Sequence, residues 1–261
     1  MVNKSIFMFY NRVIMLPSPI SYYKNLDIIK PKWSFLKKVF FSIRSLLSMI
    51  FQRIMVLLLL FFNIFIFKVK IYGKETLDKA MSDGAVFLGV HSGPYPVVGR
   101  VFHDLYPDKE VISTFYHKNK ISIFPIYKKF FKKLGFTIVA LGGAMKQIDP
   151  ILKGGGSMTL FLDARLPVPE KRTQKVKMFG IDRQLSTGPY YLANKYDLRV
   201  VPIYVKREGL TLNIHVLQEI GHKGVDQKVF MNSVASSLEY MIEDTLKSWQ
   251  TYDEFLFGKD D

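Results

Sequence analysis

One histidine directly follows an apolar run in the first half of the chain. Residues 85–90 read Ala-Val-Phe-Leu-Gly-Val, and His91 comes next, before the turn residues Ser92, Gly93 and Pro94. Such a run is typical of a buried strand, and open α/β sheets place their chemistry at the carboxyl ends of strands. Histidine titrates near neutral pH, which suits it to acid–base chemistry at such an edge. The alternative is a histidine whose hydrogen bonds are satisfied in the core or by solvent.

A second polar group follows another apolar run. Asp163 and Arg165 come directly after residues 157–162. If the two strands are neighbours in one sheet, His91, Asp163 and Arg165 converge on one crevice at its carboxyl edge. A local ion pair or a helix cap explains Asp163 and Arg165 equally well.

The remaining histidines lack the spacing of a catalytic or metal site. His103 falls near the end of a helical stretch, where we expect a surface residue. His117 and Lys118 follow a strand end, where they contact either a substrate anion or solvent. There is no His-Glu-x-x-His motif, no phosphate-binding Gly-x-x-x-x-Gly-Lys-Ser/Thr loop and no Gly-x-Ser-x-Gly elbow. We therefore expect no catalytic metal and no cofactor.

Composition narrows the class of protein further. The chain has 261 residues, of which 49% are hydrophobic, a formal net charge of +15 and no cysteine. It therefore has no thiol nucleophile and no cysteine metal site. A charge of this size favours nucleic acid or an anionic membrane surface as partner. Basic residues such as Lys37, Arg44 and Arg53 lie beside long apolar stretches, which favours the membrane, and no nucleic-acid-binding motif is present.

The most hydrophobic stretch lies near the start of the chain. Residues 54–67 form a run of 14 in which only Asn63 is polar. A membrane span needs about 20 apolar residues. We therefore expect an interfacial helix, roughly 33–62, lying in one leaflet, with a true span as the alternative. No cleaved signal peptide is expected, because no small-residue cleavage site follows a clean apolar core.

Strands and helices alternate after this anchor, which predicts one α/β domain with a mostly parallel central sheet flanked by helices. The domain division we expect is 1–62 for the arm and anchoring helix, 63–250 for the α/β domain and 251–261 for a tail. Pro202 indicates an edge, bulge or strand-end position in its strand, and the residues between 163 and 186 form a long loop. The expected strands are 65–72, 85–90, 110–115, 136–141, 157–162, 199–205 and 210–217. The expected helices are 75–81, 94–105, 121–134, one ending near 153, 187–196 and 225–248.

Several blocks occur in the order found in a known family. The chain carries Gly89-Val90-His91-Ser92-Gly93-Pro94, a basic helix ending at Gly135, Leu152-Lys153-Gly154-Gly155, and Phe161-Leu162-Asp163. The last block consists of Met178-Phe179-Gly180, Ser186-Thr187-Gly188-Pro189, Leu192-Ala193 and Val201-Pro202-Ile203. Over roughly residues 50–250 the chain resembles the lysophospholipid acyltransferase superfamily, most closely its lipid A biosynthesis (lauroyl/myristoyl) branch.

The resemblance implies transfer of a fatty acyl group from acyl carrier protein or CoA to a hydroxyl of a membrane lipid or glycolipid. It implies an enzyme on the cytoplasmic face of the inner membrane, with His91 as the general base that takes the hydroxyl proton. Asp163 and Arg165 are similar to the family's second conserved block, which handles the phosphate or sugar of the acceptor, and Arg suits that task. We expect Asp163 to belong to the catalytic site together with His91. The predicted substrate-binding residues are Ser92, Tyr95, Lys118, Arg165 and Gly180.

One position departs from the family pattern. The family has Asp or Glu five residues after its histidine, and this chain has Pro96, with no carboxylate between His91 and Asp104. Three interpretations follow: Asp163 orients His91 from the neighbouring strand, Tyr95 does so through a hydrogen bond, or the protein is an inactive relative that binds lipid or acts as a scaffold for a partner. An unrelated α/β membrane enzyme, such as a thioesterase-like hydrolase, is a further alternative.

Overall fold

The computed structural model describes residues 19–62, 64–115, 124–140, 144–164 and 168–250. The predicted tail, 251–261, lies outside the described residues. The central sheet has seven strands in the order β1-β9-β8-β2-β5-β3-β4, and β6 and β7 form a separate two-stranded sheet. The strands are β1 Lys68–Tyr72, β2 Ala85–Gly89, β3 Val111–Phe115, β4 Phe136–Ala140, β5 Ser157–Phe161, β6 Thr173–Met178, β7 Ile181–Ser186, β8 Arg199–Glu208 and β9 Thr211–Val216.

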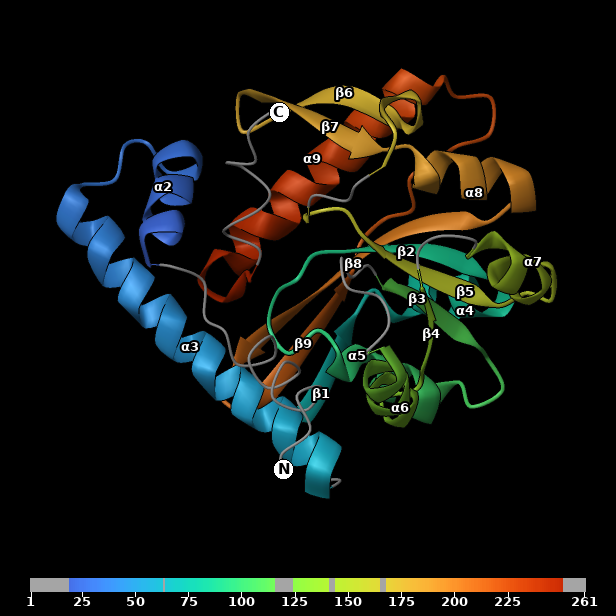
Figure 1. Ribbon diagram of the computed structural model, residues 1–261, viewed down its shortest axis with the longest axis horizontal. Helices are drawn as coiled ribbons and strands as arrows, with labels where there is room; N and C mark the ends of the chain where they lie inside the picture. Colours follow the sequence, from blue (N-terminus) through green and yellow to red (C-terminus); the bar gives the residue numbers. More distant parts are fainter. Residues whose placement is uncertain (1–18, 63, 116–123, 141–143, 165–167, 251–261) are drawn as a thin grey trace.

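Helices cover both faces of the central sheet (Figure 1). One apolar core lies under α2, α7, α8 and α9, and the other lies under α4, α5, α6 and the second half of α3. The helices are α2 Pro19–Ile29, α3 Phe35–Phe62, α4 Lys74–Asp83, α5 Val97–Leu105, α6 Phe124–Lys133, α7 Met145–Lys153, α8 Gly188–Tyr196 and α9 Gln227–Thr245, with short 3-10 turns η1 Glu170–Arg172 and η2 Leu246–Ser248.

The central sheet is mostly parallel, as predicted. All its neighbouring strands run parallel except β8 and β9, which pair antiparallel. Strand β2 lies in the middle of the sheet and is buried along its whole length, which explains why residues 85–89 are apolar without alternation. Its carboxyl end, directly before His91, lies beside the carboxyl end of β5 because the two strands pair in parallel register. The predicted α/β fold is therefore confirmed.

Two predictions about local structure are wrong. The stretch expected to be a long loop holds the β6–β7 hairpin, which packs on α9 (Figure 1). Its apolar residues are few, but Val176, Met178 and Leu185 are buried. Pro202 lies in the interior strand β8, not at an edge of the sheet. The β2 ladder ends opposite Pro202, and the β9 ladder begins at Ile203, so a residue without an N–H is tolerated there.

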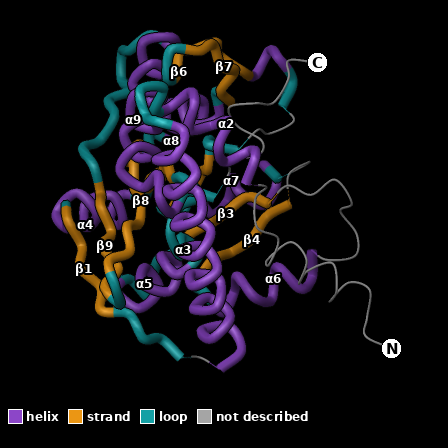
Figure 2. Tube along the Cα trace, turned by 90° about the vertical axis from the view of Figure 1, so that its left-hand side faces the viewer, coloured by secondary structure: helices purple, strands orange, loops and turns teal. Residues whose placement is uncertain are grey.

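Helix α3 confirms that the apolar stretch near the start of the chain is one long helix. It lies lengthwise against the body of the protein and does not project from it (Figures 1 and 2). Met49 packs into one core, and Met55 and Leu59 pack into the other. The segment from Phe35 to Leu59 is long and apolar enough to cross a membrane, and 33% of an 18-residue apolar stretch within it is buried.

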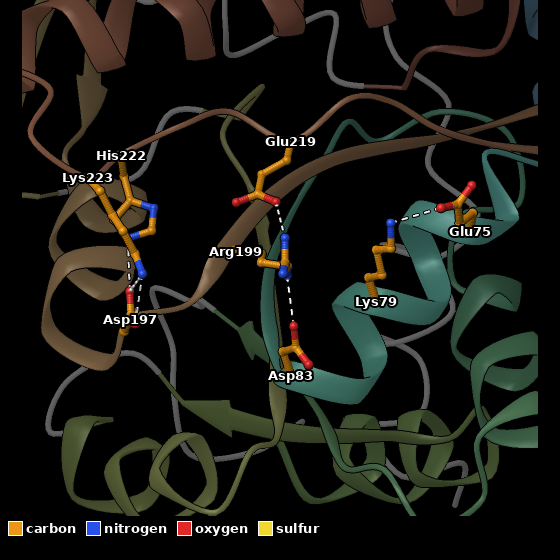
Figure 3. Close-up of polar contacts among 8 residues, drawn as sticks. All are labelled: Glu75, Lys79, Asp83, Asp197, Arg199, Glu219, His222 and Lys223. Carbon is orange, nitrogen blue, oxygen red and sulfur yellow. Dashed lines mark hydrogen bonds and ion pairs between the residues drawn. The ribbon is translucent and has the colours of Figure 1, made fainter.

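Ion pairs link the elements at the amino-terminal edge of β2 and β8. Arg199, at the start of β8, binds Asp83 at 3.0 Å and Glu219 at 2.6 Å (Figure 3). Nearby, Asp197 pairs with Lys223 at 2.7 Å (Figure 3). These charged residues occupy the edge of the sheet opposite the carboxyl end of β2, so that they belong to the scaffold.

We expect His215 to make the stability of the fold depend on pH. Its ring is stacked between Tyr72 of β1, at 4.8 Å, and Tyr204 of β8, at 4.7 Å. Burial lowers the pKa of His215, and Lys206 lowers it further, although Asp244 and Glu208 act in the opposite direction. Below about pH 6.5 the unfolded chain therefore takes up a proton at this position more readily than the folded chain does. The free energy of unfolding thus decreases as the pH is lowered.

We expect His215→Phe to reduce this acid sensitivity, because phenylalanine keeps the stacking and cannot titrate. The measurement is the free energy of urea unfolding at about pH 8 and about pH 5, on either side of the ordinary histidine pKa. Wild type should lose more stability over this interval than the variant does. An equal loss in both proteins would show that His215 does not contribute.

Candidate active site

His91 and Asp163 meet at the carboxyl edge of the sheet. Gly89 of β2 lies opposite Phe161 of β5, and each functional residue comes two positions later in its strand's extension. The Nδ1 atom of His91 is 2.7 Å from the Oδ1 atom of Asp163. The backbone N–H of His91 also donates to Oδ2 of the same carboxylate, at 2.7 Å. The predicted convergence of these two strand ends is thus present.

The Asp163 carboxylate is buried and fully engaged. Trp249, just after η2, donates its indole N–H to Oδ2 at 2.7 Å, so that three donors from two residues surround the group. Burial by itself raises the pKa of Asp163, but the charge and hydrogen bonds of His91 and the bond from Trp249 outweigh it and lower this pKa. Asp163 is therefore a carboxylate at neutral pH and accepts the proton of His91 Nδ1–H.

This hydrogen bond fixes the state of the imidazole. An ionised carboxylate only accepts, so Nδ1 of neutral His91 carries the hydrogen and Nε2 keeps its lone pair. The side chain is 23% exposed, whereas that of Asp163 is fully buried. A partly exposed imidazole with a bare Nε2, oriented from behind by a carboxylate, is arranged to take a proton from a substrate.

Two aromatic rings hold the imidazole in place. The ring of Tyr95 stands edge-on to it at 5.0 Å, and that of Phe161 lies tilted against it at 4.6 Å. Gly89 provides the space for Phe161, because a Cβ at this position would lie 2.7 Å from the phenylalanine ring. Tyr95, predicted as substrate-binding, thus lies beside His91, and the close polar contact of the imidazole is with Asp163.

The turn after His91 is fastened by the segment that follows α9. Gly93 donates its N–H to the carbonyl of Ser248 at 3.0 Å, and Gln250 donates its N–H to the carbonyl of His91 at 2.7 Å. Ser92 forms a β-bridge with Trp249 and donates its hydroxyl to the carbonyl of Val205 at 3.3 Å. Ser92, predicted to bind substrate, is fully buried and its hydroxyl serves the fold.

The other predicted site residues are not brought to His91. Gly180 is exposed in the β6–β7 turn with a left-handed φ of 79°, and its neighbour Phe179 donates its backbone N–H to Glu239 on α9. Lys118 and Arg165 lie outside the described residues. Pro96, at the position of the family's motif acid, is the N-cap residue of α5.

Three residues near His91 were not predicted. Trp249 and Phe161 contact the His91–Asp163 pair directly. Arg53 of α3 is partly buried and lies near enough to Tyr95 to interact with it electrostatically. A rare residue type was the one available indication, since Trp249 is one of only two tryptophans in the chain. Within the described ranges, no three His, Asp or Glu side chains lie close enough together to hold a metal ion.

A large cavity opens on the other face of the same strands. Its volume is about 1010 Å³, and it lies between α7, α8 and the end of β5. Apolar side chains such as Ile148, Leu160 and Leu162 line it, together with Lys171 and Lys195. Side chains alternate along a strand, so Leu160 and Leu162 point away from the face on which Phe161 contacts His91. The cavity nevertheless reaches the carboxyl edge of the sheet, where Leu162 directly precedes Asp163.

We expect Trp249→Phe to weaken the fold by about 2 kcal/mol, because the buried carboxylate loses one hydrogen bond. Chemical unfolding at neutral pH measures the loss. Trp33→Phe is the matched control, since Trp33 lies edge-on to Phe41 at 5.1 Å and contacts neither His91 nor Asp163. Equal stability changes in the two variants would contradict a special role for the Trp249–Asp163 bond.

The fold is that of an α/β protein that holds a partly exposed histidine on a buried carboxylate at the carboxyl edge of its sheet. The sequence comparison is more specific, because the family model described as "Bacterial lipid A biosynthesis acyltransferase" matches residues 18–251. The chain therefore belongs to this family of lipid acyltransferases, which confirms the resemblance seen in its motifs.

The chain was also compared with solved structures and with curated proteins. The crystal structure of the 1-acyl-sn-glycerophosphate (LPA) acyltransferase PlsC from Thermotoga maritima is similar with a TM-score of 0.42 and 11% sequence identity, over 92% of this chain and 96% of that chain. The search among curated proteins gave no match.

Proposed function

We propose that this protein transfers a fatty acyl group from a thioester donor to a hydroxyl group of a lipid or glycolipid, with His91 as general base. The observation that carries the proposal is the 2.7 Å contact between Nδ1 of His91 and the buried carboxylate of Asp163. The donor is acyl carrier protein or CoA carrying the chain as a thioester, and no cofactor takes part.

The reaction needs one proton to move twice. Nε2 of His91 takes the proton of the acceptor hydroxyl as its oxygen bonds to the thioester carbonyl carbon. The carbon–sulfur bond then breaks, and the imidazolium gives the proton to the departing thiolate. Asp163 keeps Nε2 free before the reaction and stabilises the positive charge on the ring while the proton resides there.

Asp163 takes the role that the family's motif acid has at position 96. A carboxylate at the N-cap of α5 would approach the histidine from its own turn, whereas Asp163 approaches from the neighbouring strand β5. The requirement is an ionised, buried acceptor for Nδ1–H, and its place in the sequence is immaterial. This argument favours catalysis over the alternative of an inactive lipid-binding protein.

Helix α3 supports a location in the membrane interface, because its exposed side is rich in large apolar residues, whereas its packed side is mixed. The side that packs on the body includes buried Lys38, Ser42, Ser45 and Gln52. The opposite side exposes large apolar residues, namely Phe35, Leu36, Phe40, Ile43, Leu47, Ile50, Ile54 and Phe62. A helix with one side on the protein can offer lipid only the other side, so that α3 lies parallel to the membrane plane.

The membrane is the inner one, and the protein occupies its cytoplasmic face, where acyl carrier protein and CoA thioesters are available. Basic residues on α3, such as Lys37 and Arg44, favour an anionic surface. Deletion of residues 1–62 should release the chain from membranes. Because α2 and α3 also contribute to the core, Leu47→Gln combined with Phe40→Gln on the exposed side is the gentler variant, and full retention of this variant on membranes would contradict the assignment.

The cavity between α7 and α8 accommodates the acyl chain of the donor. Its volume is about 1010 Å³, most of its lining is apolar, and the lining includes Leu162, which directly precedes Asp163 in the sequence. We expect Ala144→Phe, which extends a ring into the cavity from its lining, to lower the rate with the longest accepted chains at least about tenfold relative to shorter ones. Rates with a series of acyl donors provide the measurement, and Ala144→Ser is the matched control. An unchanged chain-length profile in Ala144→Phe would place the chain elsewhere.

The test of the proposed function is an acyl-transfer assay with the full chain. Labelled acyl carrier protein and labelled acyl-CoA are supplied separately to the protein on membranes, and the labelled lipid products are separated. We expect an acylated lipid with at least one donor. Lipid binding without transfer from either donor would instead support the inactive alternative, and release of free fatty acid would support a hydrolase.

A further inference from the structure

Three cations come from α3 and the two elements that contact it there, the end of β8 and η2. Arg44 comes from α3, Arg207 from the end of β8, and Lys247 from η2, on which α3 packs. Helix α3 packs on η2, and Arg207 lies over the ring of Phe51 on α3 at 4.4 Å, so that all three residues come from elements in mutual contact. Partial burial, and then the positive charges of Arg44 and Arg207, lower the pKa of Lys247. We call these three residues the basic cluster.

Nothing negative among the described residues balances the basic cluster. None of its members forms an ion pair within the described part of the chain, and Asp244, three residues before Lys247, pairs with Lys206 at 2.8 Å. Like charges repel one another, so that a group of this kind costs stability unless an anion binds to it.

Arg207 is held in a position that suits anion binding. Its guanidinium lies over the ring of Phe51 on α3 at 4.4 Å, and Nη1 donates to the carbonyl of Gly209 at 2.6 Å. The Nε atom is buried and has no hydrogen-bond partner among the described residues. The Arg207 side chain as a whole is partly exposed, and a guanidinium fixed by stacking can offer its accessible N–H groups to an oxyanion such as phosphate.

The basic cluster is linked to the turn that follows His91 through hydrogen bonds of residues next to its members. Val205, two residues before Arg207, accepts the hydroxyl of Ser92, and Ser248, next to Lys247, accepts the N–H of Gly93. The cluster also adjoins α3, whose opposite side exposes the apolar residues of the proposed membrane surface. A ligand here would be at the level of the lipid head groups.

We propose that Arg44, Arg207 and Lys247 bind the phosphate of an anionic lipid head group and so place the lipid beside His91. This proposal deepens the proposed function, because the bound lipid is either the acceptor itself or a bilayer lipid that sets the depth of the site. Binding does not require catalysis, so it can be tested apart from transfer.

The experiment measures flotation of the full-length protein with vesicles. One set consists of phosphatidylcholine alone, and the other also contains phosphatidylglycerol. We expect stronger binding to the anionic vesicles, with a loss of roughly fivefold for each of Arg44→Gln, Arg207→Gln and Lys247→Gln, and roughly a hundredfold for the triple variant. Lys228→Gln, exposed on α9, is the matched control and should cost much less. Binding to phosphatidylcholine should be the same in all these proteins.

Several results would overturn the proposal. One is a single-variant loss on anionic vesicles no larger than that of Lys228→Gln. Another is a protein that shows no preference for anionic vesicles although inorganic phosphate raises the thermal unfolding temperature of wild type and not that of the triple variant. The basic cluster would then bind free phosphate and not a lipid head group. If the triple variant does not fold, the test rests on the single variants of the two exposed residues, Arg44→Gln and Lys247→Gln, and on their loss of binding to anionic vesicles. His91→Gln should bind vesicles as wild type does, so that failure of the proposed chemistry leaves this test intact.

Discussion

Replacing Asp163 by asparagine should lower the rate of acyl transfer by about ten-thousandfold while the fold persists. The asparagine amide is nearly the same shape and can still accept from the His91 backbone and from Trp249. Its NH2 group, however, donates to Nδ1 of His91 and thereby moves the imidazole hydrogen to Nε2. His91 then has no lone pair facing the substrate, and the base is lost although its position is unchanged.

The transfer rate and the unfolding curve of Asp163→Asn should be measured together. Asp83→Asn is the matched control, because Asp83 pairs with Arg199 at the opposite edge of the sheet (Figure 3). The control should transfer acyl groups at the wild-type rate. If Asp163→Asn kept most of its activity, an acid other than Asp163 would have to orient His91.

His91→Gln should remove the base itself and lower the transfer rate by about ten-thousandfold, the upper end of what general-base catalysis contributes. Glutamine is similar in size and can still donate to Asp163, so that the buried carboxylate keeps a partner. His103→Gln, at an exposed position on α5, is the control and should have no effect. Transfer of labelled acyl chains under saturating donor measures both rates, and an active His91→Gln variant would exclude His91 as the base.

The sequence predicted that His91 and Asp163 converge if their two strands are neighbours, because parallel neighbouring strands end at the same edge. That β2 and β5 are neighbours comes from the structure. It did not predict Trp249, whose indole reaches Asp163 only through the path of the chain after α9. The β6–β7 hairpin was missed because it has few apolar residues and its burial depends on α9. Pro202 was misplaced, because the change from parallel to antiparallel pairing at that residue is a property of the whole sheet.

The orientation of α3 illustrates the same limit. Its sequence is apolar nearly all round, so that its periodicity does not indicate which side faces the body. Lys38 is buried because it forms an ion pair with Asp27, close to it in the fold but on the preceding helix. Partners of this kind are set by tertiary packing, and they turn an apolar helix into one with a defined outer side.

The central claim is that His91 and Asp163 act as one unit, and a double variant tests it most directly. If Asp163 acts only through His91, adding Asp163→Asn to His91→Gln should lower the transfer rate no further, because the losses of residues that work as a unit are not additive. The four rates, for wild type, each single variant and the double variant, should be measured with the same donor and membranes. The contradicting result is a double variant whose transfer rate lies below that of His91→Gln by the same factor by which Asp163→Asn lowers the wild-type rate. The two residues would then act independently.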